Sequence, residues 1–421
     1  MTAIPEHAGG LPGACDVAIV GGGPAGLGAA LRLKHLGIEA IVLDREAEAG
    51  GIPRHCGHYP FGMREFHRIL KGPDYARRLV QAAKQAGVAI FTQTSVVALD
   101  PGPCLTVTTP DGRAEIRAKR ILLSTGVRER SRAGRLVGGQ RPWGVLSTGA
   151  LQSMVYLKGR RPFERPVIVG SELVSFSAIL TCRHAGIRPV AMVEANDRVT
   201  AWWFAAGLPR LTGVPLHLNS RVLRVVGDQR VEAVELQNGA GASRLIEADG
   251  VIFSGQFLPE ATLPRAAGLT IDPGSGGPAV DQYGRCSDPA VFAAGNLLRP
   301  VETAGWSWQE GVFAADRIAA SLAGQLSERQ GAIEMRVHGD AAVKFVLPQR
   351  LALPVLPGAM RNLQLRAKRP FHGTLSVRQN GRTLWSGRRS GRPERRILLP
   401  LAPIAEKAVP GTIEIDLQEE F

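Results

Sequence analysis

Two stretches of the chain repeat one pattern of apolar and glycine-containing segments. In the first, residues 15–20 are apolar except for Asp16, four of the six residues at 21–26 are glycine, and residues 38–43 before Asp44 are apolar except for Glu39. Runs that are apolar on both faces are typical of parallel strands, which are covered by helices on each side. The pattern therefore predicts a strand–helix–strand unit over residues 15–44, and a second unit of the same rhythm over 167–194.

Outside these units the pattern predicts a helix, hairpins and a change of class. Residues 72–87 have helical periodicity, and Asp111-Gly112 stands between two strand-like runs. From 335 onward, short alternating runs replace long helical patterns, and Asn380-Gly381 predicts a type I′ hairpin. We expect a small all-β, sandwich-like domain there.

Composition narrows the class of protein. With 421 residues, 44% hydrophobic and 21% charged, the chain is expected to be globular with two to four domains. No apolar run reaches the roughly 18 residues that a membrane-spanning helix needs. The first 16 residues carry neither a basic segment nor an apolar one, so we predict no secretory signal and a cytoplasmic location.

The net charge of +14 is partly local, because residues 335–421 contain 15 Lys and Arg against 7 Asp and Glu. No nucleic-acid-binding motif accompanies this charge, so we expect an arginine-rich solvated surface and no nucleic-acid partner. The five cysteines are odd in number and widely spaced. That spacing argues against a disulfide framework and against a structural zinc site, so no metal is expected.

The turn at 21–26 carries the strongest chemical signal. Gly21, Gly23 and Gly26 fit the G-x-G-x-x-G pattern between a strand and a helix. Such glycines permit a tight turn, close approach of a pyrophosphate and close packing of the helix on the strand. Asp44 ends the next strand, where a carboxylate binds a ribose hydroxyl. The sequence therefore predicts a dinucleotide site at this turn.

Three segments together resemble a known superfamily. GGGPAGLGAA at 21–30, LLSTG at 122–126 and VFAAGNLL at 291–298 are similar to the flavin-contacting segments of the pyridine nucleotide-disulfide oxidoreductases. The resemblance covers about residues 15–325. It implies an α/β fold in which a Rossmann-like FAD-binding domain (14–160 and 257–328) is split by a Rossmann-like NAD(P)-type domain (161–256), followed by the basic β domain at 335–421. Residues 50–79 further resemble the subgroup that includes glycerol-3-phosphate-dehydrogenase-like and amine- or opine-oxidising flavoproteins.

The resemblance also implies roles for individual residues toward FAD. Gly21, Gly23, Pro24 and Gly26 would hold the pyrophosphate, with Gly51 beside them, and Asp44 the adenosine ribose. The remaining contacts would come from Arg45 and Val97 at the adenine, Thr125 and Gly126 along the cofactor, and Gly295 and Asn296 at the ribityl chain and the flavin phosphate. The superfamily usually has Asp where this chain has Asn296, which still accepts a hydrogen bond but carries no charge.

The second turn departs further from the pattern. It reads Gly170-Ser171-Glu172-Leu173-Val174-Ser175, so a carboxylate occupies the place of the second glycine. Glu172 would repel a pyrophosphate at close range, which makes NAD(P)H binding doubtful, although Glu194 could still meet a ribose. The other interpretation is a relic domain, kept for its structure or used to bind a partner.

The superfamily's disulfide reductases place a cysteine pair after the Gly-Gly at 50–51, but this chain has His55, Cys56 and His58 there. Thiol–disulfide exchange needs a resolving thiol, so disulfide reductase chemistry is not expected. By position the loop would lie over the flavin, which makes these three residues candidates for substrate contact or proton transfer. The other interpretation is a structural loop with hydrogen-bonded histidines.

Trp306 and Trp308 stand near the start of the last helix of this part, whose N-terminus faces the flavin in the superfamily. They would line a substrate pocket or pack in the core.

Three functions fit these observations. The favoured one is an FAD-dependent dehydrogenase or oxidase subunit that moves a hydride or electrons between FAD and a small substrate or a partner flavoprotein. The alternatives are an NAD(P)H-dependent flavin reductase and a non-catalytic, FAD-stabilised subunit of a hetero-oligomer.

Overall fold

The computed structural model describes residues 6–7, 10–201, 203–326, 333–337, 342–393 and 395–420. It divides into two compact units. Unit 1 comprises residues 1–51, 76–127 and 259–421, and unit 2 comprises residues 52–75 and 128–258. The predicted end of the FAD-binding part at residue 328 lies outside the described residues.

Unit 1 is built on a mixed sheet with the strand order β5-β4-β3-β8-β7-β6, in which β20 also pairs with β8. Strands β5, β4, β3, β8 and β20 run parallel to one another. Strand β7 is antiparallel to both of its neighbours, β8 and β6. Their bounds are β3 Ala14–Val20, β4 Ala40–Leu43, β5 Ala89–Phe91, β6 Ser95–Asp100, β7 Cys104–Thr109, β8 Gly112–Leu123 and β20 Val291–Ala293. The predicted unit at 15–44 and the hairpin at Asp111-Gly112 are confirmed. A short pair, β1 (Glu6–His7) and β2 (Leu11–Pro12), precedes the sheet.

Two helices of unit 1 pack very closely on each other. A Cβ atom on Gly28 of α1 (Pro24–His35) would lie 2.8 Å from the Trp308 ring of α7 (Ala304–Leu322). A Cβ atom on Gly311 would lie 1.9 Å from the carbonyl oxygen of Ala25. Glycines on both helices therefore set this packing. The predicted helix at 72–87 is confirmed as α2 (Gly72–Gln85), and α6 covers Thr262–Ala266.

Unit 2 contains the second predicted strand–helix–strand unit, which is confirmed. Its parallel sheet has the order β11-β18-β12-β13-β14, and a second sheet has the order β10-β15-β16-β17. The strands are β10 Gly138–Gly139, β11 Val145–Ser147, β12 Pro166–Val169, β13 Ala191–Val193, β14 Leu216–His217, β15 Ser220–Val226, β16 Ala233–Asn238, β17 Ser243–Glu247 and β18 Gly250–Phe253. The helices are α3 Thr148–Gln152, α4 Leu173–His184 and α5 Gly207–Leu211. Strands β9 (Val127–Glu129) and β19 (Phe257–Pro259), where the chain leaves and re-enters unit 1, pair with each other.

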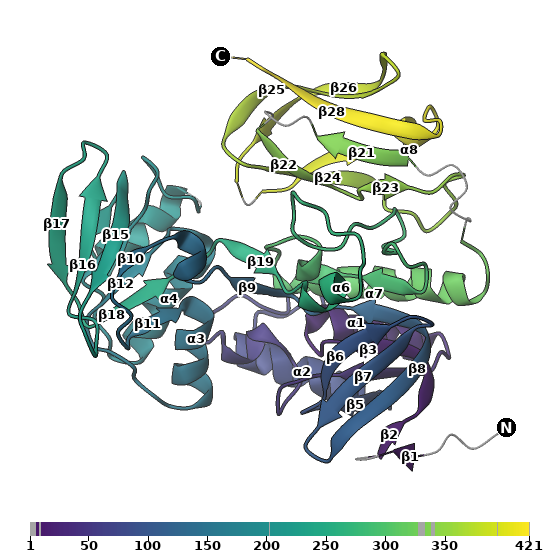
Figure 1. Ribbon diagram of the computed structural model, residues 1–421, viewed down its shortest axis with the longest axis horizontal. Coiled ribbons are helices and arrows are strands. Elements are labelled where there is room, and N and C mark those ends of the chain that lie inside the picture. The colour runs from purple at the N-terminus through teal and green to yellow at the C-terminus, as the bar shows by residue number, and fades with distance from the viewer. Residues whose placement is uncertain are drawn as a thin grey trace. The chain divides into compact units, whose positions relative to one another are not determined.

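The C-terminal part of unit 1 is an all-β region of two sheets, as the sequence predicts (Figure 1). One sheet has the order β23-β21-β28-β25-β26 and the other β22-β24-β27. The strands are β21 Ile333–Val337, β22 Val343–Leu347, β23 Arg350–Leu351, β24 Asn362–Ala367, β25 Phe371–Gln379, β26 Arg382–Gly391, β27 Ile397–Pro400 and β28 Gly411–Glu419, with the short helix α8 Ala402–Ala405. Asn380 and Gly381 have φ values of +50° and +75°, so the predicted type I′ turn is confirmed.

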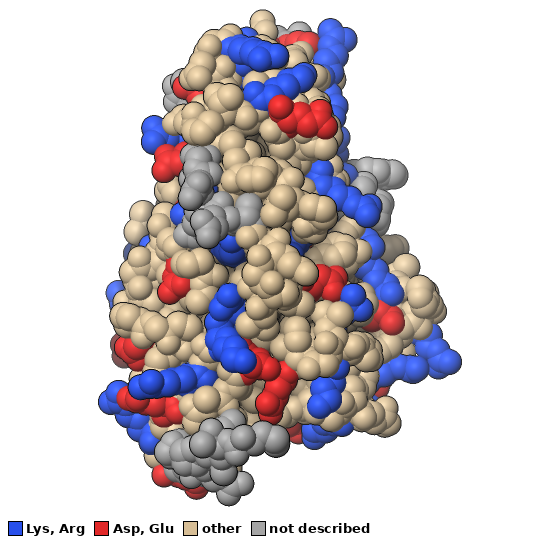
Figure 2. Space-filling model, turned by 90° about the vertical axis from the view of Figure 1, so that its right-hand side faces the viewer, with Lys and Arg blue, Asp and Glu red and all other residues tan. Residues whose placement is uncertain are grey.

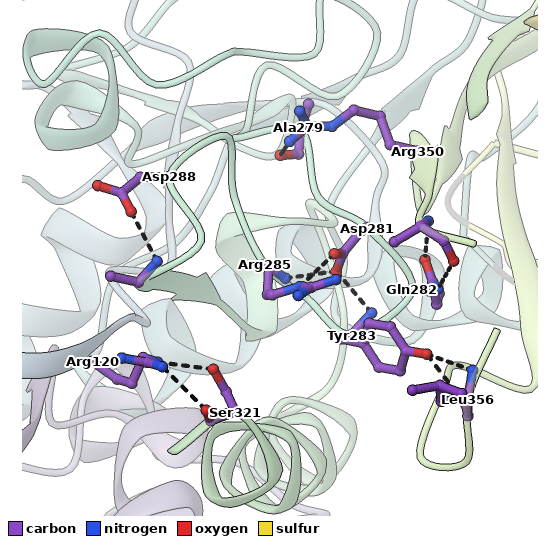
Figure 3. Close-up of polar contacts among 12 residues, drawn as sticks. Arg120, Ala279, Asp281, Gln282, Tyr283, Arg285, Asp288, Ser321, Arg350 and Leu356 are labelled. Carbon is purple, nitrogen blue, oxygen red and sulfur yellow. Dashed lines mark hydrogen bonds and ion pairs between the residues drawn. The ribbon is translucent and has the colours of Figure 1, made fainter. Parts of the chain in front are cut away.

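A buried loop before β20 fixes this β region to the rest of unit 1 (Figure 3). The side-chain amide of Gln282 donates to the Ala352 carbonyl at 2.7 Å and accepts from the Ala352 N–H at 2.8 Å. The Leu356 N–H donates to the Tyr283 hydroxyl oxygen at 2.7 Å. Asp281 stabilises the loop from within through its buried ion pair with Arg285 at 2.6 Å. These bonds satisfy polar groups that are shielded from water on both sides of the contact.

Charged side chains of both signs are interspersed on the face of the molecule shown in Figure 2. Among the described residues, no helix has the length and apolar character needed to cross a membrane. In the same residues, no cluster of three or more His, Cys, Asp or Glu side chains has an arrangement that would hold a metal ion.

Candidate functional site

The first glycine turn leaves main-chain groups uncovered at the start of α1. Gly21 has φ +108°, and a Cβ atom there would lie 2.6 Å from the Ser124 carbonyl oxygen. A Cβ atom on Gly26 would lie 1.9 Å from the carbonyl oxygen of Gly21, so both positions exclude a side chain. Gly23 differs, because the nearest atom to its Cβ position is Gly51 Cα at 3.9 Å.

The helix N-terminus at this turn has no side-chain cap. Gly23 is the N-cap residue of α1 and Pro24 its first residue, and no side chain bonds to the first-turn N–H groups. Uncapped N–H groups at a helix N-terminus attract an anion. Open space over Gly23 beside such a terminus fits the pyrophosphate of a dinucleotide. Gly51, with φ +64°, lines the same space.

Asp44 lies beside the turn, where β4 ends. Its side chain is 8% exposed, and its carboxylate accepts hydrogen bonds from the Gly22 N–H at 2.8 Å and from the Glu46 N–H at 2.9 Å. A carboxylate has about four acceptor positions, so a ribose hydroxyl remains compatible with these bonds.

Arg45 and Val97, the two residues expected at the adenine, are both exposed at the surface. Arg45 is exposed and lies 3.7 Å from Glu46. Val97 is 52% exposed and is the extra residue where the pairing of β6 with β7 shifts register. The chain at Gln93 and Thr94 is held directly against this corner, because their N–H groups donate to the carbonyls of Glu46 and Asp44.

The segment after β8 is anchored to Glu260. The Thr125 hydroxyl donates to the Glu260 carbonyl at 2.8 Å, and the Gly126 carbonyl accepts from the Glu260 N–H at 2.9 Å. Ser124, which the sequence pattern did not single out, donates from its hydroxyl to the carbonyls of Val20 and Gly21 at 3.0 and 2.9 Å. Its hydroxyl therefore stabilises the turn below the open space.

Gly295 and Asn296 follow β20 and lie against the N-terminal half of α7. The Gly295 N–H donates to the Glu310 carboxylate at 3.1 Å. The Asn296 side chain accepts from the Glu302 N–H at 2.7 Å and donates to the Glu302 carbonyl at 3.2 Å. A carboxylate cannot donate the second bond, so the Asn in place of the usual Asp closes this loop on both sides.

A buried hydroxyl faces the same corner. Ser307 is 5% exposed, and its Oγ atom has no hydrogen-bond partner among the described residues. It would lie 3.9 Å from a Cβ atom on Gly295. An unsatisfied buried hydroxyl beside an uncapped helix and an open glycine turn fits a polar ligand such as FAD.

The two tryptophans of α7 have different surroundings. Trp308 packs against Gly28 of α1, which makes it part of the helix–helix contact. Trp306 is half-buried, and the guanidinium carbon of Arg396, from the C-terminal β region, lies 3.8 Å from its ring centroid. Trp308 therefore belongs to the contact between α1 and α7, and one face of Trp306 is covered by an arginine.

In unit 2, the second turn is filled by its own side chains. Gly170 keeps a positive φ of +113°, but the Glu172 carboxylate accepts from the Gln256 N–H at 2.7 Å. The acid at the end of β13, Glu194, is 6% exposed and accepts from the N–H and the side-chain amide of Asn196 at 3.0 and 2.7 Å. It also accepts from the Ser171 hydroxyl.

His55, Cys56 and His58 also belong to unit 2. Cys56 is 8% exposed, and its thiol lies 3.4 Å from the Ile52 carbonyl and 3.6 Å from the Gln152 side-chain oxygen. Burial, assisted by the charge of Glu129, raises the pKa of Cys56 to about 12. A thiol with this pKa is protonated and unreactive at neutral pH.

The two histidines differ in exposure. His55 is 9% exposed, at the end of a 3₁₀ turn over Ile52–His55. His58 is half-buried, and its Nδ1 lies 3.0 Å from the Tyr59 carbonyl. A carbonyl oxygen only accepts, so Nδ1 of His58 carries the proton and Nε2 is the acceptor in the neutral ring. Their position relative to a flavin stays a prediction.

Comparison with known proteins agrees with the geometry of the first turn. The pattern of the pyridine nucleotide-disulphide oxidoreductase family matches residues 15–311. The chain belongs to this family. It is accordingly an oxidoreductase of the flavoprotein class, with FAD as its cofactor and Rossmann-like folds.

Relatives within the family differ in what they do. An opine oxidase subunit of Rhizobium meliloti (strain 1021) is 25% identical over 74% of this chain and 72% of its own length. Thioredoxin reductase of Listeria innocua is 26% identical over 69% of this chain and 89% of its own. The matches to two further opine oxidase subunits span only 58% and 61% of their lengths.

Solved structures share the fold. Thioredoxin reductase of T. acidophilum superposes with a TM-score of 0.63 at 22% identity, over 74% of this chain and 99% of its own. L-proline dehydrogenase of P. horikoshii superposes with a TM-score of 0.57 at 22% identity, over 75% of this chain and 57% of its own. At this identity they show the fold alone.

Proposed function

We propose that this chain is an FAD-dependent dehydrogenase or oxidase subunit that is not reduced by NAD(P)H. In this proposal Gly21, Gly23, Pro24 and Gly26 hold the FAD pyrophosphate, with Gly51 beside them, and Asp44 holds the adenosine ribose. The other proposed FAD contacts are Arg45, Val97, Thr125, Gly126, Gly295 and Asn296. The FAD-binding domain would comprise residues 14–160 and 257–328, divided by the NAD(P)-type domain at 161–256 and followed by the β domain at 335–421.

The filled second turn is the observation that carries this proposal. A dinucleotide pyrophosphate needs a bare main chain at the helix N-terminus, and the Glu172 carboxylate stands there, bonded to Gln256. A nucleotide ribose needs acceptor positions on the acid that ends the second strand. Glu194 already accepts from Ser171, twice from Asn196 and, at 3.5 Å, from the Thr200 hydroxyl, which together occupy the four or so acceptor positions of a carboxylate. Reduction by NAD(P)H would require both groups to rearrange.

The cysteines argue against disulfide reduction. Among the described residues no two of the five cysteines form a disulfide. Burial raises the pKa of Cys182 to about 12, as it does for Cys56. Neither thiol is therefore activated as the nucleophile that disulfide exchange requires, although thioredoxin reductases are among the relatives.

The substrate class we propose is a small secondary amine. Two similar proteins belong to an opine oxidase and a sarcosine oxidase. Opines and sarcosine are secondary amines. Both relatives are single subunits of their oxidases, so we further propose that this chain works with a second, flavin-containing subunit. A glycerol-3-phosphate-type alcohol is the other small substrate that the sequence resemblance suggests.

The residues of this chain would serve the reaction by binding and orientation. FAD, when bound, supplies the acceptor for a hydride or for two electrons from the substrate. The N-terminus of α1 holds the diphosphate, the N-terminus of α7 favours negative charge on the reduced ring, and Asn296 keeps the loop after β20 closed. His55 and His58 are the candidates for accepting a substrate proton, while Cys56, held as a thiol, supports their loop.

Anaerobic stopped-flow mixing tests the proposal. Purified yellow protein is mixed in turn with NADH, NADPH and a panel of secondary amines, and flavin bleaching is followed in the visible spectrum. We expect no bleaching by either nicotinamide within seconds and bleaching by at least one amine, alone or with the partner subunit. Bleaching by NADPH within milliseconds to seconds would instead identify a flavin reductase. Protein that stays oxidised with every donor until a partner is added would favour the non-catalytic subunit.

A further inference from the structure

Glu302, the residue before the N-cap of α7, is held by two arginines of the C-terminal β region. Arg396 donates to both carboxylate oxygens of Glu302, each at 2.7 Å, and Arg366 of β24 forms an ion pair with the same carboxylate. The side chains of Glu302, Arg366 and Arg396 are 7%, 4% and 16% exposed. A shielded bidentate pair of this kind is much stronger than a surface ion pair.

The main chain of Glu302 binds the side chain of Asn296, in the loop after β20. Its N–H and carbonyl bond to the Asn296 side chain at 2.7 and 3.2 Å. One residue therefore connects the β region, through its carboxylate, to the loop after β20, through its backbone. Although burial opposes ionisation, the hydrogen bond from Arg396 and the charge of Arg366 hold the pKa of Glu302 below its ordinary value.

A second connection runs parallel to the first. Glu310 accepts from the Gly295 N–H and forms an ion pair with Arg299. Arg299, which is 1% exposed, donates to the side chain of Gln364 on β24 at 2.6 Å. Gly295 and Asn296 are thus both connected to the C-terminal β region, Gly295 through Glu310 and Arg299 and Asn296 through Glu302 with Arg366 and Arg396.

The β region has a further contact with the rest of unit 1. The buried loop at 279–285 bonds to residues 349–356 through side chains and main chain, and Figure 3 shows the bonds of Gln282 and Tyr283. Arg366 and Arg396 also bring positive charge to the N-terminus of α7, where Arg396 covers Trp306.

We propose that Glu302 is a positioning residue through which Arg366 and Arg396 of the C-terminal β region set the affinity for FAD and the reduction potential of the flavin. The inference rests on the proposed placement of FAD at Gly295, Asn296 and the N-terminus of α7. The two arginines hold α7 and the loop after β20 in the FAD-binding arrangement. Their positive charge favours the anionic reduced flavin over the oxidised one.

Arg396→Gln tests this. It removes one positive charge and the bidentate bond while Arg366 continues to pair with Glu302. We expect the dissociation constant for FAD, measured by fluorescence titration of apoprotein, to rise at least tenfold. We also expect the flavin equilibrium with a reference redox dye to shift at least tenfold toward the oxidised form, which is about 30 mV for a two-electron couple.

Two further variants separate positioning from folding. Arg369→Gln is the matched control, because Arg369 makes an exposed pair with Glu419 in the same domain. It should leave both measurements at the wild-type values. Arg396→Lys keeps the charge but loses the bidentate geometry, so affinity should fall while the potential changes less than in Arg396→Gln. Circular dichroism of the apoprotein shows whether Arg396→Gln folds. If it does not fold, the FAD affinity of Arg396→Lys tests the prediction in its place.

Wild-type affinity and potential in both Arg396 variants would overturn the inference while leaving the proposed function intact. Wild-type protein that takes up no FAD would instead overturn the proposed function.

Discussion

The Cβ position of Gly26 lies 1.9 Å from the carbonyl oxygen of Gly21, so the third glycine of the turn has no room for even a methyl group. The turn and the first turn of α1 are therefore in direct main-chain contact. This contact places the helix N-terminus directly at the end of β3, where an anion meets its N–H groups.

Gly26→Ala should displace α1 from β3. We expect the melting temperature to fall and FAD to be retained poorly, since overpacking of this kind costs about 1–3 kcal/mol. Differential scanning fluorimetry and the ratio of flavin to protein absorbance measure both effects. Gly207→Ala is the control, because nothing lies within 4 Å of that Cβ position. A Gly26→Ala protein as stable and as yellow as wild type would contradict the proposed packing.

Gly23→Glu should abolish FAD retention with little loss of stability. A Cβ atom at Gly23 meets no atom closer than Gly51 Cα at 3.9 Å, so the backbone accommodates the substitution, but the new carboxylate would stand in the proposed pyrophosphate space. The visible spectrum of the purified variant measures bound flavin, and its melting curve in the apo form should match that of the wild-type apoprotein. Retained yellow colour would refute the assignment of Gly23.

Glu172→Gly should open the second turn in unit 2. Removing the carboxylate restores the second glycine of the pattern, while Ser175 stays at the third position, so we expect flavin reduction by NADH or NADPH to become at least tenfold faster than in the wild type. Glu172→Gln is the matched variant, because it removes the charge but keeps the volume. A rate gain in both would indicate that repulsion dominates, and a gain in the glycine variant alone that space does. No gain in either would show that the filled turn does not limit the reaction.

The buried thiols should make stability depend on pH at alkaline values. The pKa of Cys182 rises from 9.0 in the unfolded chain to about 12 in the folded protein because of burial. A group whose folded pKa is raised contributes full stability below its unfolded pKa and loses it as the pH rises from about 9 to about 12. Cys182→Ala should therefore lose less stability than wild type between pH 8 and pH 10, by about 1 kcal/mol. Urea unfolding at the two pH values measures this, and identical pH dependence in both proteins would contradict it.

Cys56→Ser tests whether that thiol is structural. We expect FAD to stay bound and amine oxidation to continue, because a protonated thiol with a pKa of about 12 cannot act as a base or nucleophile near neutrality. In native wild-type protein, Cys56 should react with a thiol reagent only after unfolding. A loss of turnover with FAD still bound would assign Cys56 a role in the chemistry.

Local sequence is sufficient to predict much of this protein. The G-x-G-x-x-G turn, the strand–helix–strand rhythm and the Asn380-Gly381 turn depend on backbone conformations and apolar periodicity within short segments, and all three lie where the sequence predicts them. Gly26 is required by a main-chain contact within the same turn, since its Cβ position meets the Gly21 carbonyl oxygen. The departure at Glu172 is also visible in the sequence, because the second position of the motif normally requires a glycine that lets the main chain approach a pyrophosphate.

Contacts between these motifs and residues far away in the sequence are known only from the folded structure. Nothing in the spacing connects Glu302 with Arg366 and Arg396, or Ser124 with Gly21, since these pairs form when segments far apart in the sequence meet in the folded chain. The sequence likewise left Trp306 and Trp308 equivalent. The close approach of α1 and α7 at Gly28 places Trp308 in the contact between the two helices, and an arginine of the β region covers one face of Trp306. Hydrogen bonds and ion pairs between elements depend on three-dimensional position, which periodicity along a single chain does not encode.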